Sequence, residues 1–127
     1  EAIAQKATKP LDVHLMIVHP EKYVERFAKV GAQMISFHLE AAMDDGTDPG
    51  KIIDLIRSSG AKAGMAIDPD VPVEELFPYI DKVDFALIMS ENCDALAQAG
   101  VSLFVAGSTV FKAEDRISTV KRLRGEI

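Results

Sequence analysis

The chain has 127 residues, the size of one ordinary domain, and 48% of them are hydrophobic while 27% are charged. Its 14 basic and 20 acidic residues give a formal net charge of −6, which argues against nucleic acid or an anionic membrane as a partner. The single cysteine, Cys93, excludes an intrachain disulfide, and no apolar run approaches the roughly 18–20 residues of a membrane span.

Short apolar segments alternate with helical patterns along the chain. Strands are expected at residues 11–18, 34–39, 61–67, 83–89 and 101–106. Helices are expected at residues 21–30, 51–59, 72–79, 92–99 and 114–124. Residues 1–7 are expected to form the end of another helix. A polar loop is expected at residues 44–50.

Strands that are joined by helices of this length predict right-handed βαβ units and a parallel sheet. Both a doubly wound open sheet and a (β/α)₈ barrel fit this pattern, but five strands are too few to close a barrel, which needs at least about 200 residues. Only the 11 residues from Ser90 to Gly100 connect the last two strands, and a parallel crossover needs at least about 10–12 residues. The junction between Ser90 and Glu91 is therefore compressed, as if a segment were missing.

Two histidines occupy positions that could carry chemistry. Strand alternation places Asp12, His14 and Met16 on one face. A histidine near the C-terminal end of a barrel strand could bind a divalent metal, or it could be a core histidine that bonds to a neighbouring carbonyl. His38 and Glu40 repeat the theme at the end of the second strand, where a metal pair, an acid and base, or a hydrogen-bonded strand terminus would fit.

A glycine-serine turn closes the expected strand at residues 101–106. Gly107 would let a ligand approach the backbone, and the following N–H groups with the Ser108 hydroxyl could hold an anion at a helix N-terminus. The pattern indicates a phosphate site, and an ordinary βα turn is the alternative. Met16 and Met89 lie near strand ends, as core filler or as pocket walls.

Taken together and in order, five segments resemble the ribulose-phosphate 3-epimerase family. They are LDVHLM at 11–16, FHLEA at 37–41, KAG with Pro69 and VPVE at 62–74, residues 83–89, and VAGS with Val110-Phe111 at 105–111. The resemblance implies an α/β fold, a parallel (β/α)₈ TIM barrel of which about five βα units are present. We expect one barrel domain over residues 1–127, with segments missing before Glu1 and at the Ser90–Glu91 junction.

The resemblance also implies an activity. The family interconverts D-ribulose 5-phosphate and D-xylulose 5-phosphate in the pentose phosphate pathway, by metal-assisted removal and return of the C3 proton through an enediolate. It implies one divalent metal ion (Zn, Fe, Mn or Co) and a small sugar phosphate as substrate. We also expect a homo-oligomer, and the single cysteine indicates a reducing, cytoplasmic compartment. An allulose-6-phosphate 3-epimerase or a non-catalytic sugar-phosphate-binding barrel fragment are the alternatives.

The family's functional residues can be carried over at a few positions. His14 matches the metal-binding histidine of the third barrel strand, and Met16 and Met89 match pocket methionines, so the substrate pocket is expected to contain all three. Gly107 and Ser108 match the phosphate-binding turn after the eighth strand.

The departures from the family pattern are also informative. No aspartate of the chain aligns with either catalytic aspartate of the family, and His38 and Glu40 match a motif to which the resemblance assigns no role. The chain is therefore either part of a complete epimerase or a truncated, inactive barrel fragment. We favour the first explanation, because a barrel without several strands would expose open sheet edges and an apolar core.

Overall fold

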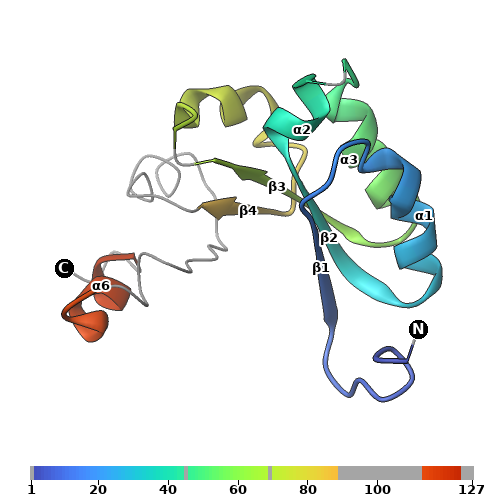
Figure 1. Cartoon of the computed structure of the whole chain (residues 1–127), viewed down its shortest axis with the longest axis horizontal. Coiled ribbons are helices and arrows are strands. Elements are labelled where there is room, and N and C mark those ends of the chain that lie inside the picture. Colours follow the sequence, from blue (N-terminus) through green and yellow to red (C-terminus); the bar gives the residue numbers. More distant parts are fainter. Residues whose placement is uncertain (1, 45, 69, 89–112, 124–127) are drawn as a thin grey trace.

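The computed structural model describes residues 2–44, 46–68, 70–88 and 113–123 (Figure 1). Within them, strands β1 (Leu11–Leu15), β2 (Ala32–His38), β3 (Lys62–Ile67) and β4 (Phe85–Ile88) form one sheet in chain order, and every neighbouring pair is parallel. The connections contain α1 (Glu21–Lys29), α2 (Leu39–Asp44), α3 (Pro49–Ser58) and the 3₁₀ helix η1 (Val73–Tyr79), and α6 spans Arg116–Leu123. The predicted parallel β/α architecture is confirmed.

One face of the sheet carries the main hydrophobic core. Helices α1 and α3 lie side by side against this face (Figure 1). Val24 of α1 and Ile53 of α3 are fully buried against Ile35, Phe37 and Met65 of the strands. Such a parallel sheet needs apolar cover from its crossover helices, and the spacing of apolar residues in α1 and α3 supplies it.

Local chemistry fixes where α3 begins and ends. The Asp48 side chain accepts a hydrogen bond of 2.8 Å from the backbone N–H of Gly50, and Pro49 occupies the first helical turn. The chain leaves the helix through Gly60, whose φ of +87° lies in the left-handed region that favours glycine. After the helix ends, the chain enters β3, which lies beside β2 in the sheet.

The opposite face of the sheet holds a smaller cluster. Phe85, Ala66 and Leu87 are buried there, with Met34 packed against them. Gly64 pairs with Ser36 on one side and with Phe85 on the other. This face also carries the polar residues of the candidate site, so the small apolar cluster and the site share one face of the sheet.

The first two strands both end earlier than predicted, at Leu15 instead of residue 18 and at His38 instead of residue 39. The first strand was expected to reach residue 18, but pairing of β1 with β2 ends at Leu15 opposite Phe37. The chain of β2 then turns into helix α2 at Leu39, so Met16 has no strand residue beside it and is 65% exposed. Helix α2 itself was not predicted.

The remaining expectations either differ from the structure or lie outside the residues that it describes. Residues 2–6 form turns instead of the end of a helix, since Lys6 and Ala7 bond back only to the carbonyl of Ile3. The helix at 72–79 is a 3₁₀ helix with Pro78 inside it. The predicted elements at 92–99 and 101–106 lie outside the described residues. Among the helices that are described, none has both the length and the apolarity to cross a membrane.

Candidate active site

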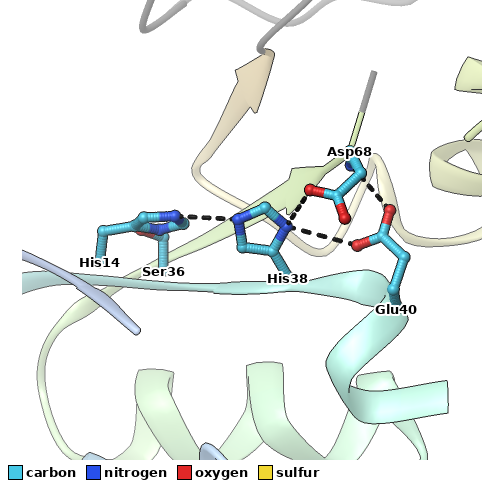
Figure 2. Close-up of polar contacts among 5 residues, drawn as sticks. All are labelled: His14, Ser36, His38, Glu40 and Asp68. Carbon is cyan, nitrogen blue, oxygen red and sulfur yellow. Dashed lines mark hydrogen bonds and ion pairs between the residues drawn. The ribbon is translucent and has the colours of Figure 1, made fainter. Parts of the chain in front are cut away.

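A row of polar side chains crosses the C-terminal ends of β1, β2 and β3. Nδ1 of His14 and Oγ of Ser36 share a hydrogen bond of 2.9 Å, and Nε2 of His14 lies 3.1 Å from Nε2 of His38 (Figure 2). The two imidazole rings are tilted by 48°, with their centroids 4.9 Å apart. The pairing of His14 with Ser36 in the β1–β2 register brings these groups to one face of the sheet.

The second nitrogen of His38 faces two carboxylates. Nδ1 lies 3.4 Å from Oε2 of Glu40 and 3.3 Å from Oδ1 of Asp68 (Figure 2). The backbone N–H of Asp68 donates a hydrogen bond of 2.8 Å to Oε1 of Glu40, which fixes this carboxylate beside the imidazole. The side chain of His38 is only 12% exposed, against 59% for Asp68. The row therefore runs from a buried interior to the surface.

Burial decides the charge of the inner histidine. Desolvation lowers the pKa of His14, the neighbouring His38 lowers it further, and Asp12 partly opposes both effects. Burial raises the pKa of Asp12, against the opposing effect of His14. His14 is thus held as a neutral imidazole near pH 7, and this is the form that binds a metal ion.

A cavity of about 400 Å³ opens at the outer end of the row. Its lining includes the apolar side chain of Met16 together with His38 and three acidic residues, Glu40, Asp44 and Asp68. Among the residues that the structure describes, no lysine or arginine lines this cavity. The cavity therefore favours a cation or hydroxyl groups over a phosphate.

The donor set of this row suits a divalent cation. One ligand atom each from His38, Glu40 and Asp68 lies within 4.8 Å of the others. Oε2 of Glu40 is buried and accepts no hydrogen bond from any residue that the structure describes. A buried anionic oxygen without a donor is costly, and positive charge beside it would remove that cost. Imidazole and carboxylate ligands fit Zn²⁺, Fe²⁺, Mn²⁺ and Co²⁺.

The sequence-predicted site residues are found only in part. His14 lies on the polar face near the end of β1, and Met16 lines the cavity beside the row. Glu40 belongs to α2 instead of the strand end, because the chain turns into the helix immediately after His38. Met89, Gly107 and Ser108 lie outside the described residues.

Two residues of the row were not predicted. Ser36 is fully buried in β2 and holds His14, while Asp68 directly follows β3. Asp68 had a usable signal, because it stands at the C-terminal end of an expected strand, as His14 does. Ser36 had none, since its role depends on the strand register.

Polar side chains gathered at the C-terminal edge of a parallel β/α sheet are the arrangement of α/β enzymes, barrels and open sheets alike. A sequence profile described as the ribulose-phosphate 3 epimerase family matches residues 1–95 of the chain. The chain belongs to this family of isomerases, and its sheet is part of the family's barrel.

Individual relatives agree with this assignment. The chain is 29% identical to a ribulose-phosphate 3-epimerase of Bacillus subtilis, over 98% of this chain and 76% of the relative. It is 31% identical to ribulose-phosphate 3-epimerase 2 of Cupriavidus necator, over 91% of this chain and 65% of the relative. It is 45% identical to the Synechocystis ribulose-phosphate 3-epimerase, over 72% of this chain and 39% of the relative.

The lengths of these matches carry information as well. The chain spans about two thirds of the length of several relatives, such as 63% of the Candida glabrata protein. The alignment with the Bacillus subtilis relative covers 168 positions, 41 more than the 127 residues of this chain. That relative therefore has at least this many residues without a counterpart here.

Proposed function

We propose that this chain is part of a ribulose-phosphate 3-epimerase, which interconverts D-ribulose 5-phosphate and D-xylulose 5-phosphate by inverting C3. The observation that carries the proposal is the placement of His14, in the family's LDVHLM segment, on the polar face at the C-terminal sheet edge. A neutral imidazole at this edge is a suitable ligand for a divalent cation.

His14 would hold the cation through Nε2, which would exchange its contact with His38 for the cation while Nδ1 keeps its hydrogen bond to Ser36. When bound, a divalent cation supplies positive charge beside the substrate oxygens that become negative as the C3 proton leaves. Residues of this chain would orient the His14 ligand and limit the access of water to it. Ser36 fixes the plane of the His14 ring, and the buried cluster of Phe85 and Leu87 keeps water from below the site.

Proton transfer at C3 needs two groups on opposite faces of the substrate. We assign these roles to the two family aspartates, which no aspartate of the 127 residues matches. Their segments would belong to the complete protein, one of them inserted at the Ser90–Glu91 junction. The 41 unmatched alignment positions support this assignment, and the sequence of the encoding gene across the junction tests it.

The remaining substrate contacts are also part of the proposal. Met16 and Met89 would line the pocket, and Gly107 with Ser108 would bind the phosphate. The acidic lining of the described cavity supports a phosphate site elsewhere, since Glu40 and Asp68 would repel a dianion. We further propose a cytoplasmic homo-oligomer, whose size analytical ultracentrifugation of the complete protein would measure.

Proton exchange tests the activity directly. The complete protein, incubated with D-ribulose 5-phosphate and a divalent metal in deuterated water, should incorporate deuterium at C3 and form D-xylulose 5-phosphate. The His14→Ala variant should lose most of this activity, whereas His19→Ala, a histidine outside the row, should retain it. Absence of exchange in the unaltered protein would overturn the proposal. Faster turnover of allulose 6-phosphate would instead identify the related epimerase.

A further inference from the structure

We propose that a second cavity, at the sheet edge opposite the candidate active site, binds the phosphate group of a small phosphate monoester. The cavity has a volume of about 590 Å³ and is lined by Ala4, Gln5, Arg26, Lys29 and Val30. We call it the basic cavity. The inference goes beyond the epimerase proposal and does not depend on it, because none of these residues belongs to the polar row.

The basic cavity lies at the N-terminal ends of the strands. Lys29 ends α1 and Val30 follows it, shortly before β2 begins at Ala32, while Ala4 and Gln5 precede β1. Figure 1 shows the N-terminal segment below this end of α1. β1 and β2 have five and seven residues, which span about 17–23 Å at about 3.3 Å per residue. The polar row lies at the opposite ends of the same strands, so one small ligand cannot occupy both places.

The two cavities have linings of opposite charge. Arg26 and Lys29 line the basic cavity, and no acidic residue of the described chain does. The cavity at the other edge is lined by Glu40, Asp44 and Asp68 without lysine or arginine from the described residues. Because the chain as a whole has a net charge of −6, the positive lining is a local feature. It favours an anion at this edge of the sheet.

Both cations are available to a ligand. Among the residues that the structure describes, the side chains of Arg26 and Lys29 have no ion-pair or hydrogen-bond partner. They are three positions apart on α1 and are therefore neighbours on its surface. The guanidinium presents a planar fork of donors that fits two phosphate oxygens, and the ammonium adds a second positive charge. Two cations match a phosphate monoester, whose charge near pH 7 is about −1.5 to −2.

The opposite wall adds a hydrogen-bond donor. The backbone N–H groups of Lys6 and Ala7 donate hydrogen bonds of 3.0 and 2.9 Å to the carbonyl of Ile3, and this turn holds Ala4 and Gln5 at the cavity. The side-chain amide of Gln5 has no partner within the described part of the chain and can donate to an oxyanion. The volume lies within the range of about 300–1,000 Å³ for small-molecule sites, so there is room for the organic part of the ester.

The alternative role of the two cations is support of α1. Basic side chains in the last turn of a helix interact favourably with its C-terminal carbonyl groups, and both Arg26 and Lys29 occupy that turn. In this role they would stabilise the helix and bind no anion. The two roles are separable, because only the first gives a response to phosphate in solution.

Titration of the full chain with glycerol 3-phosphate, at constant ionic strength, tests the proposal. We expect saturable changes in the backbone amide NMR signals of Ala4, Gln5 and Val30. Arg26→Gln and Lys29→Gln should each weaken this binding about three- to tenfold.

Three further variants or ligands sharpen the test. Arg26→Lys, which keeps the charge but loses the fork, should weaken binding less than Arg26→Gln does. Lys22→Gln is the matched control, because it removes a lysine charge from the first turn of the same helix, outside the cavity. It should leave the affinity unchanged. Gly107→Val, in the proposed phosphate turn for the substrate, should also leave these three signals responsive.

Three outcomes would contradict the proposal. Equal weakening in Lys22→Gln would show a general attraction to α1, and a lower free energy of unfolding in Arg26→Gln without any response to glycerol 3-phosphate in the unaltered chain would establish the helix-support role. Equal affinity for succinate would overturn the assignment to phosphate. Each of these outcomes leaves the epimerase proposal intact, since deuterium exchange at C3 tests that activity separately.

Discussion

The aromatic ring of Phe85 lies over Gly64, in the space that a side chain at residue 64 would occupy. A Cβ atom built on Gly64 would collide with two carbons of this ring and would lie 2.8 Å from Cβ of Ser36. Because Ser36 in turn holds His14, the glycine couples the packing of the sheet to the candidate site.

The Gly64→Ala variant should therefore be destabilised by about 1–3 kcal/mol, the usual cost of overpacking. Urea unfolding of the variant measures this cost. Adding Phe85→Leu should recover part of the stability, because the smaller side chain gives the new methyl group room. A Gly64→Ala chain as stable as the wild type would show that the ring of Phe85 yields easily.

The Ser36→Ala variant tests the hydrogen bond that positions the His14 ring. Loss of the hydrogen bond to Nδ1 of His14 should weaken divalent-metal binding about tenfold, within the range for groups that support a ligand. The loss of stability should be smaller, about 1 kcal/mol for one hydrogen bond. Isothermal titration calorimetry and urea unfolding measure the two effects.

Ser58→Ala is the matched control for this serine. Its hydroxyl donates a hydrogen bond of 2.9 Å to the carbonyl of Leu55 at the exposed end of α3, so metal binding should not change. Equal weakening in both serine variants would remove the special role of Ser36.

The lowered pKa of His14 predicts how stability depends on pH without metal. The folded chain binds the His14 proton more weakly than the unfolded chain, whose pKa is about 6.5. The free energy of unfolding should therefore fall as the pH decreases below about 6.5, and this contribution should be constant above it.

Urea unfolding in the presence of a chelator, at intervals from pH 7.5 to 5.5, measures this dependence. The raised pKa of Asp12 acts with the opposite sign, at pH values above its ordinary value of about 3.9. The His14→Gln variant should lose the His14 part of the slope. An identical slope in that variant would assign the dependence to another group.

The proposed phosphate turn gives a prediction for catalysis. Gly107→Val should raise KM for the sugar phosphate many-fold, because a branched side chain would obstruct approach of the phosphate oxygens. Ser108→Ala should weaken substrate binding by about 0.5–1.5 kcal/mol, the value of one hydrogen bond, or by up to about 3 kcal/mol because the phosphate acceptor is charged. Steady-state kinetics of the complete protein measure both, and an unchanged KM in a folded Gly107→Val variant would contradict the assignment.

The sequence by itself determined the order of the strands in the chain, their parallel direction and the face on which His14 lies. These features depend on local information. Apolar runs mark buried strands, helical connections require parallel neighbours, and alternation assigns each residue to a face. Residues 11–15 and 62–67 accordingly form strands where the apolar pattern placed them.

The meeting of His14 with Ser36, His38 and Asp68 was decided only by the tertiary structure. Strand register brings Ser36 beside His14, and register is set by how the whole sheet packs against α1 and α3 rather than by any local pattern. The same packing sends the chain into α2 after His38, which places Glu40 on a helix and still beside the imidazole. A sequence shows which groups are available, but contacts between distant groups depend on the folding of the segments between them.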